Sequence, residues 1–143
     1  MGQSIRKMKW VGGLKFEGTS VYGHKITTDS SETFGGKGEG YSPTELILFG
    51  VAGCTGIDIV RILEKQRQKL TDLEIEVTSH QVDEGQPRPY YAIEIKYIVR
   101  GENLDEKKLA QAIELSEGKY CTVSQTLKEQ VEITTSYEID NQA

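Results

Sequence analysis

The first forty residues alternate between short apolar runs and polar or glycine-rich stretches, which is typical of short β-strands joined by turns. Two such runs flank the pair Gly12-Gly13, and this arrangement predicts a hairpin. Residues 25–28 predict a third short strand, and the glycine-dense residues 29–41 predict a loop. The N-terminal part is therefore expected to form three short strands followed by a loop.

The longest apolar stretch of the chain predicts a helix. Residues 42–45, Ser-Pro-Thr-Glu, form a capping box with proline at the first helical position, so we expect a helix from there to about Leu70. Its first half is almost entirely apolar, which predicts burial on most sides. Gly50, Gly53 and Gly56 each cost helix propensity about 1 kcal/mol relative to alanine. Their spacing indicates that another backbone or helix approaches closely.

The second half of the chain alternates strands and helices. Residues 72–83 and 90–100 alternate apolar and polar positions with a period of two and predict a long hairpin. Asp105 is the expected N-cap of the next helix, and Gly118 its expected left-handed C-terminal residue. The remaining predicted elements are a helix over 106–117, a short helix to about 129 and a strand over 131–139. The order βββ–α–ββ–αα–β is an α+β pattern, and residues 1–143 have the length of a single domain.

Composition and charge exclude several classes of protein. The chain has 17 Lys and Arg against 22 Asp and Glu, a net charge of −5, which argues against a nucleic-acid partner. The first ten residues carry no apolar segment of the kind that directs secretion. The apolar residues 46–60 are too few to span a bilayer and contain Asp58. We therefore predict a cytoplasmic protein without membrane association, in which thiols stay reduced.

Two cysteines, Cys54 and Cys121, are the candidate chemistry of this chain. They are too few and too far apart for a disulfide scaffold. Together with His24 and His80 they show no metal-ligand spacing, so no metal site and no cofactor are predicted. No Ser–His–Asp or Cys–His arrangement can be identified either.

Each cysteine allows two interpretations. Cys54 lies in an apolar helical stretch, where a free cysteine commonly acts as a small buried hydrophobe. Cys121 lies at the turn into a short helix, where free backbone N–H groups favour a thiolate. If the fold brings the two together, one thiol can be oxidised to a sulfenic acid that the other resolves as a disulfide. Asp58, one turn from Cys54, disfavours a thiolate there unless a cation compensates, and Arg61 is placed to pair with Asp58 on the helix surface.

Several segments of the chain resemble the OsmC/Ohr family of bacterial thiol peroxidases. They are Ser42–Leu46, Ala52–Thr55 with Asp58–Val60, and Lys119–Val123. The N-terminal Lys9–Gly13, with Gly23-His24 and Asp29, is most similar to the YhfA-like branch of that family. The resemblance covers nearly the whole chain. It implies an OsmC-like fold, which is an intertwined α+β homodimer with its two central helices packed together and its active sites at the subunit interface.

The resemblance also implies a reaction. Cys54 would be the peroxidatic cysteine and Cys121 the resolving cysteine in the reduction of a small organic hydroperoxide, as part of oxidative stress defence. A dithiol such as dihydrolipoamide would restore the reduced protein. Leu46, Phe49 and Ile57 would line an apolar substrate pocket.

Two features of the family differ in this sequence. Peroxidase members place an Arg beside the N-terminal Gly-Gly, whereas Leu14 and Lys15 follow the glycines here. Those members also carry a Glu directly after the Pro of the helix start, whereas that position is Thr44 here and Glu45 comes one residue later. Glu45 is the candidate catalytic carboxylate, and the other interpretation is that it serves only the capping box. Lys15 or Arg6 is the candidate replacement for the missing Arg.

Three hypotheses follow. The first is a dimeric, cysteine-based organic hydroperoxide reductase. The second is a non-catalytic stress-related protein that binds a small apolar ligand at the dimer interface. The third is an α+β dimer whose cysteines are core residues without chemistry.

Overall fold

The computed structural model describes residues 2–142 of the chain. They form two compact units, one that runs up to Ile47 and one that begins at Leu48. The organisation of residues 1–143 as a single domain stays a prediction.

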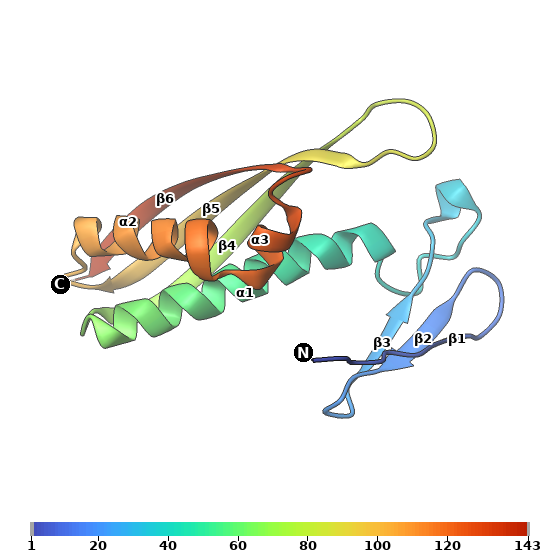
Figure 1. Cartoon of the computed structure of the whole chain (residues 1–143), viewed down its shortest axis with the longest axis horizontal. Helices are drawn as coiled ribbons and strands as arrows, with labels where there is room; N and C mark the ends of the chain where they lie inside the picture. The colour runs from blue at the N-terminus through green and yellow to red at the C-terminus, as the bar shows by residue number, and fades with distance from the viewer. Residues whose placement is uncertain (1, 143) are drawn as a thin grey trace. The chain divides into compact units, whose positions relative to one another are not determined.

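The N-terminal unit holds a three-stranded antiparallel sheet (Figure 1). Its strands, in spatial order, are β1 (Met8–Trp10), β2 (Phe16–Thr19) and β3 (Lys25–Thr28). Gly12 and Gly13 have φ angles of 106° and 54° in the turn between β1 and β2, a conformation that glycine adopts without strain. The predicted hairpin and third strand are confirmed.

The glycine-rich loop after β3 is held by one carboxylate. Asp29 is buried and accepts hydrogen bonds from the backbone N–H groups of Ser30, Lys37 and Glu39. These bonds, that of Glu39 foremost, hold the pKa of Asp29 below its ordinary value. A single 3₁₀ turn, η1 (Glu32–Phe34), interrupts the loop.

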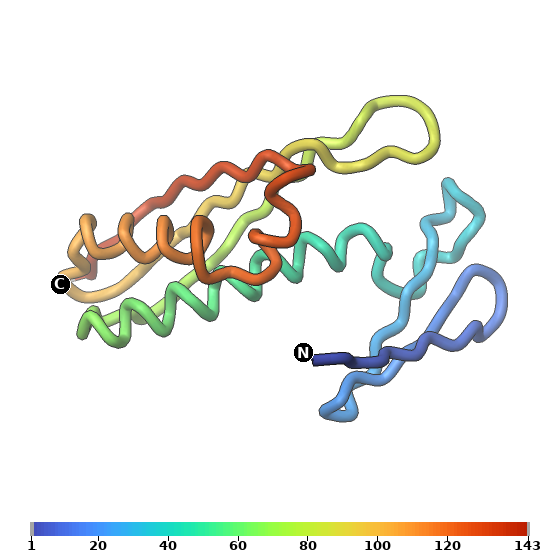
Figure 2. Tube along the Cα trace, in the orientation of Figure 1, coloured from blue at the N-terminus to red at the C-terminus, as the bar shows by residue number. Residues whose placement is uncertain are grey.

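Helix α1 (Pro43–Lys65) begins where the capping box predicts, but it ends earlier than expected. The N–H of Gln68 donates to the carbonyl oxygen of Leu63 at 2.9 Å, and Arg67 adopts a left-handed conformation with φ of 57°. This closing turn satisfies a terminal carbonyl group and directs the chain into strand β4 (Lys69–Gln81). The prediction of a helix to about Leu70 is therefore wrong, and Figure 2 shows the tight reversal between α1 and β4.

The C-terminal unit is built on a second three-stranded sheet. Its central strand, β5 (Tyr90–Glu102), pairs antiparallel with β4 and parallel with β6 (Glu132–Gln142). A parallel pair requires a crossover connection. The crossover consists of α2 (Glu106–Leu115), the single π-helical turn η2 (Ser116–Tyr120) and α3 (Thr122–Leu127). The element order confirms the predicted α+β fold class.

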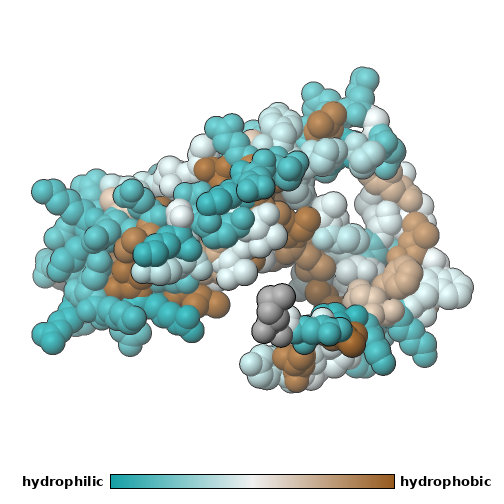
Figure 3. Space-filling model, viewed as in Figure 1, coloured by the Kyte–Doolittle hydropathy of each residue, from teal (hydrophilic) through white to brown (hydrophobic). Residues whose placement is uncertain are grey.

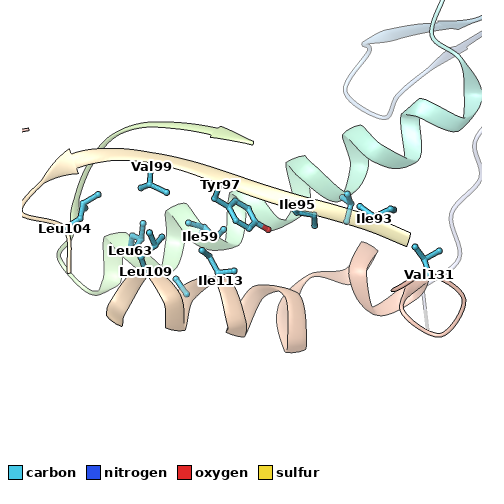
Figure 4. Close-up of a cluster of buried hydrophobic side chains, with 12 residues drawn as sticks. Ile59, Leu63, Ile93, Ile95, Tyr97, Val99, Leu104, Leu109, Ile113 and Val131 are labelled. Atoms are coloured by element: carbon cyan, nitrogen blue, oxygen red, sulfur yellow. The ribbon is translucent and has the colours of Figure 1, made fainter. Parts of the chain in front are cut away.

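The core of this unit lies between β5 and the two longer helices (Figure 4). The two-residue period of β5 places its apolar side chains on one face, where they are buried together with side chains of α1 and α2. The most deeply buried of these residues are Ile93, Ile95, Tyr97 and Val99 from β5, Val51, Ile59 and Leu63 from α1, and Leu109 and Ala112 from α2. Full burial of a large aliphatic side chain contributes about 1.5–3 kcal/mol, so this layer fixes the position of α1 on the sheet.

The glycines of α1 do not share one closely packed face in this chain. A Cβ atom on Gly56 would lie 2.9 Å from Cδ1 of Ile75 on β4, so the close approach there is with the chain's own sheet. A Cβ atom on Gly50 or Gly53 would meet nothing within 4 Å. Among the described residues α1 is also the one helix whose length and hydropathy would let it cross a membrane, a test that core helices of soluble proteins pass as well.

Helix α2 continues into η2 instead of ending at Gly118. Asp105 caps α2 as predicted, because its carboxylate accepts hydrogen bonds from the N–H groups of Lys107 and Lys108. Gly118, however, is not among the glycines with a positive φ, so its predicted role as a left-handed C-terminal residue is wrong. The N–H of Cys121 donates to the carbonyl oxygen of Ser116 at 2.7 Å, and this five-residue step closes the π turn.

Candidate functional site

The fold brings the two cysteines together within the C-terminal unit. Cys54 is half-buried in the middle of α1, Cys121 is fully buried at the start of α3, and both are free thiols. Their sulfur atoms and a carboxylate oxygen of Asp58 all lie within 4.8 Å of one another. Because a disulfide has an S–S length of about 2.0 Å, the two sulfurs need to approach by less than about 3 Å to bond. The two thiols can therefore act as a pair.

The backbone holds Cys121 firmly. It is the N-cap residue of α3, and its sulfur accepts a hydrogen bond from the N–H of Ser124 at 3.3 Å. Burial raises the pKa of the Cys121 thiol, the backbone N–H and the nearby hydroxyl of Ser124 oppose that shift, and the neighbouring Cys54 adds to it. The effect of burial on this pKa is therefore larger than the effect of the N–H groups at the start of α3. The sequence predicted that these groups favour a Cys121 thiolate, but the structure favours the neutral thiol.

Asp58 is held by a hydroxyl group instead of by the expected cation. The fully buried Ser116, the first residue of η2, donates a hydrogen bond from Oγ to Oδ2 of Asp58 at 2.9 Å. The same Oγ lies 3.5 Å from the carbonyl oxygen of Thr55. Within residues 2–142 Asp58 forms no ion pair with Arg61, so the predicted surface ion pair is absent. The hydrogen bond from Ser116 to Asp58 therefore joins η2 to α1 next to the two thiols.

A surface pocket opens beside Asp58. It has a volume of about 550 Å³, and its lining includes Arg61, Lys65 and Tyr120. Arg61 lies seven residues after Cys54, which places the two on nearly the same face of α1. Asp58, the acidic member of the thiol site, thus faces this pocket together with the cationic side chains of Arg61 and Lys65.

The other predicted site residues lie elsewhere on α1. The carboxylate of Glu45 accepts a hydrogen bond from the N–H of Ser42 at 2.9 Å, which is the geometry of a capping box. Leu46 is half-buried, whereas Phe49 and Ile57 are 58% and 55% exposed. A catalytic role for Glu45, and a substrate pocket formed by the three apolar residues, stay predictions.

Sequence reasoning missed a tyrosine at this site. Tyr97 is fully buried in the core layer (Figure 4), and its hydroxyl has no hydrogen-bond partner in proper geometry among residues 2–142. The nearby Thr55 hydroxyl donates instead to the carbonyl oxygen of Val51 at 2.9 Å. Burial raises the pKa of Tyr97 to about 12, and the nearby acidic groups of Cys121, Glu117 and Asp58 add to the increase. The sequence did contain a signal for Tyr97, because the two-residue period of β5 places it among the buried apolar positions. A tyrosine at such a position must have its hydroxyl inside the core.

Comparisons with known proteins add a family context. A family model described as OsmC-like protein matches residues 36–136. Protein YhfA from Escherichia coli strain K12 is 41% identical over 133 residues, which cover 93% of this chain and 96% of that protein. The crystal structure of a hypothetical protein from Aquifex aeolicus VF5 superposes with a TM-score of 0.86 at 29% identity and covers 100% of both chains. An organic hydroperoxide resistance protein OsmC from Legionella pneumophila has a TM-score of 0.69 at 16% identity and covers 96% of this chain and 99% of that one. At 16% identity, the similarity to the Legionella protein is one of fold alone.

Proposed function

This chain belongs to the OsmC-like protein family, and from that premise we propose that it reduces organic hydroperoxides with Cys54 and Cys121 in oxidative stress defence. The observation that carries the proposal is the distance of less than 4.8 Å between the two sulfur atoms. The substrate class is supported by a neighbour of the same fold that is named as an organic hydroperoxide resistance protein. We place the reaction in the cytoplasm, where free thiols persist.

In the proposed reaction Cys54 attacks first, because it is the more accessible thiol. Its thiolate attacks a peroxide oxygen, the O–O bond breaks, and the alkoxide leaves as an alcohol after it takes up a proton. Cys54 is oxidised to the sulfenic acid. The Cys121 thiolate then attacks the sulfur of Cys54, the S–S bond forms, and hydroxide leaves and is protonated to water. A dithiol such as dihydrolipoamide reduces the disulfide and becomes a disulfide itself.

A peroxidatic cysteine is activated by a nearby positive charge, whereas the charged group that lies beside Cys54 is the carboxylate of Asp58. Lys15 pairs with Glu39 at 3.3 Å within the N-terminal unit. Arg61 lies on the Cys54 side of α1 and lines the pocket beside Asp58. We therefore propose that Arg61 activates the Cys54 thiol, a role that peroxidase members of the family assign to an Arg beside the N-terminal glycines.

The proposed enzyme is a homodimer. The apolar side chains of Phe49, Ile57 and Val60 are 58%, 55% and 42% exposed on α1, and the open Gly53 lies between the first two. Figure 3 shows hydrophobic residues that reach the surface between hydrophilic ones. A second copy of α1 packed against this face would bury them and would close the apolar walls around a hydroperoxide. A molar mass of one chain in light scattering would contradict this part of the proposal.

The test is hydroperoxide consumption by the reduced protein with dihydrolipoamide as the electron donor. The wild type is expected to consume an organic hydroperoxide catalytically, and Cys54→Ser to lose about 1,000-fold or more of that rate. The control is Thr134→Ser on the exposed face of β6, which keeps the wild-type rate. Equal rates for Cys54→Ser and the wild type would remove Cys54 from the mechanism and would favour the non-catalytic apolar-ligand hypothesis.

A further inference from the structure

The thiol site unites three groups of the kinds that bind zinc in proteins. The Cys54 sulfur, the Cys121 sulfur and an Asp58 carboxylate oxygen lie within 4.8 Å of one another. The sequence predicts no metal site, because its cysteines and histidines stand at no metal-ligand spacing. The fold creates the cluster by placing the middle of α1 beside the start of α3. The three groups come from two helices and span more than sixty residues of the chain.

The distances suit a tetrahedral ion. Zinc binds cysteine sulfur at about 2.3 Å and carboxylate oxygen at about 2.0–2.2 Å, so two sulfurs bound to one ion lie about 3.8 Å apart. Because every pair of the three atoms lies within 4.8 Å, each pair needs to close by little more than about 1 Å. Side-chain rotations of this size require no change in the backbone.

Hydrogen bonds already orient two of the three ligands. Ser116 is fully buried and donates to Oδ2 of Asp58 at 2.9 Å, which leaves the other carboxylate oxygen for an ion. The N–H of Ser124 donates to the sulfur of Cys121 at 3.3 Å. Donors of this kind fix the direction of metal ligands and typically affect affinity by about 10–100-fold.

One coordination position remains open toward solvent. Cys54 and Asp58 are half-buried, and Asp58 lines the pocket of about 550 Å³ that also includes Tyr120. Three protein ligands with a fourth position taken by water or substrate are the pattern of catalytic zinc sites, whereas structural zinc sites use four protein ligands. The three residues therefore match an open site and not a structural one.

We propose that the reduced protein binds one soft divalent cation, of the class of Zn²⁺, through Cys54, Cys121 and Asp58. The ion and the Cys54–Cys121 disulfide exclude each other, because both need the same two sulfurs. A corollary rests on the proposed function. A bound ion holds Cys54 away from a hydroperoxide, and oxidation of the pair by a hydroperoxide removes two of the three ligands and releases the ion.

The test uses Co²⁺ as a spectroscopic probe of the fully reduced protein, with no peroxide present. We expect one Co²⁺ per chain, with an intense sulfur-to-cobalt charge-transfer absorption that Zn²⁺ abolishes by displacement. The same titration on the disulfide form is expected to show no such absorption. A reduced protein without the absorption, or an oxidised protein with an equal one, overturns the proposal.

Variants separate this site from adventitious binding. Asp58→Asn keeps both thiols and is expected to weaken Co²⁺ binding about tenfold or more, and Ser116→Ala to weaken it about 10–100-fold. Asp83→Asn, in the exposed loop between β4 and β5, is the matched control and should bind as the wild type does. Equal affinity of Asp58→Asn and the wild type overturns the assignment of Asp58. Because the readout is binding alone, loss of hydroperoxide reduction and loss of metal binding are separate results.

Discussion

The segments that carry the two cysteines differ in regularity and in access. Cys54 lies in the middle of a regular helix of 23 residues and is half-buried. Cys121 lies between a π turn and a helix of six residues, and it is fully buried. The regular segment leaves its thiol accessible to a solute. In the irregular segment the N–H of Cys121 donates to the carbonyl oxygen of Ser116, and the N–H of Ser124 donates to the thiol sulfur, so the cysteine is held in place from both sides of the chain.

This difference indicates how the work of a thiol pair is divided. An attacking thiol must meet a molecule from solution, whereas a resolving thiol needs only to reach a sulfur that is already close. A π turn inside a helical segment is uncommon and frequently occurs at functional sites. Here η2 places Ser116 against Asp58 and Cys121 beside Cys54. The irregular backbone therefore positions the Cys121 thiol, and the regular helix leaves the Cys54 thiol accessible to solutes.

After the loss of Cys54, the largest expected effect on turnover comes from a change that removes only the positioned thiol. Cys121→Ser is expected to reduce one equivalent of hydroperoxide as the wild type does and then to slow by about 100-fold in later turnovers, because the Cys54 sulfenic acid has no partner. Rapid-mixing measurement of the first turnover, with mass spectrometry after a sulfenic-acid-specific reagent, checks both parts.

The comparison with Cys54→Ser makes this prediction discriminating. Cys54→Ser should fail in the first turnover, whereas Cys121→Ser should fail only afterwards. If Cys121→Ser also loses the first turnover, or forms no sulfenic acid, the division between an attacking and a resolving thiol is wrong.

Local sequence signals predicted much of the framework. The glycine pair of the first hairpin, the proline at the start of α1 and the two-residue period of β5 each act through neighbouring residues, and each prediction is confirmed. The Asp105 cap is confirmed for the same reason, because its partners stand two and three residues away.

The features that the sequence left open depend on long-range contacts. The proximity of the two thiols joins residues far apart in the chain, and Asp58 is bound by Ser116, a residue 58 positions away, instead of by Arg61. The predicted helix extends past the end of α1 because the polar residues 66–69 suit a helix surface as well as a turn and an edge strand. Such choices are decided by packing, which a single sequence does not display.

A second prediction concerns Tyr97, whose hydroxyl lies close to both cysteine segments. Its pKa is about 12 in the folded protein and about 10 in an unfolded chain, so above pH 10 only the unfolded form ionises. The stability that the neutral, buried group contributes is present below about pH 10 and is lost by about 3 kcal/mol as the pH rises to about 12. Denaturant unfolding of the wild type and Tyr97→Phe as a function of pH checks this.

Tyr91→Phe is the control for this measurement, because Tyr91 is on the same strand and is 56% exposed. Tyr97→Phe should flatten the alkaline part of the stability curve, and Tyr91→Phe should not. The same alkaline loss in Tyr97→Phe and the wild type would show that the hydroxyl ionises freely in the folded protein.

The smallest expected effect is the pH dependence of disulfide closure, and it tests whether the positioned thiol is held in its neutral form. Closure requires the Cys121 thiolate, and burial raises the pKa of that thiol. Below that pKa the thiolate fraction falls about tenfold per pH unit, so closure after a single peroxide pulse should slow about tenfold from pH 8 to pH 7. The nearby Ser124 hydroxyl lowers the pKa of the Cys121 thiol, so Ser124→Ala should slow closure a further few-fold at pH 7, whereas Thr126→Ala on the same helix should not. A closure rate that is flat between about pH 6 and pH 8, or that is faster in Ser124→Ala, would mean that burial does not control Cys121.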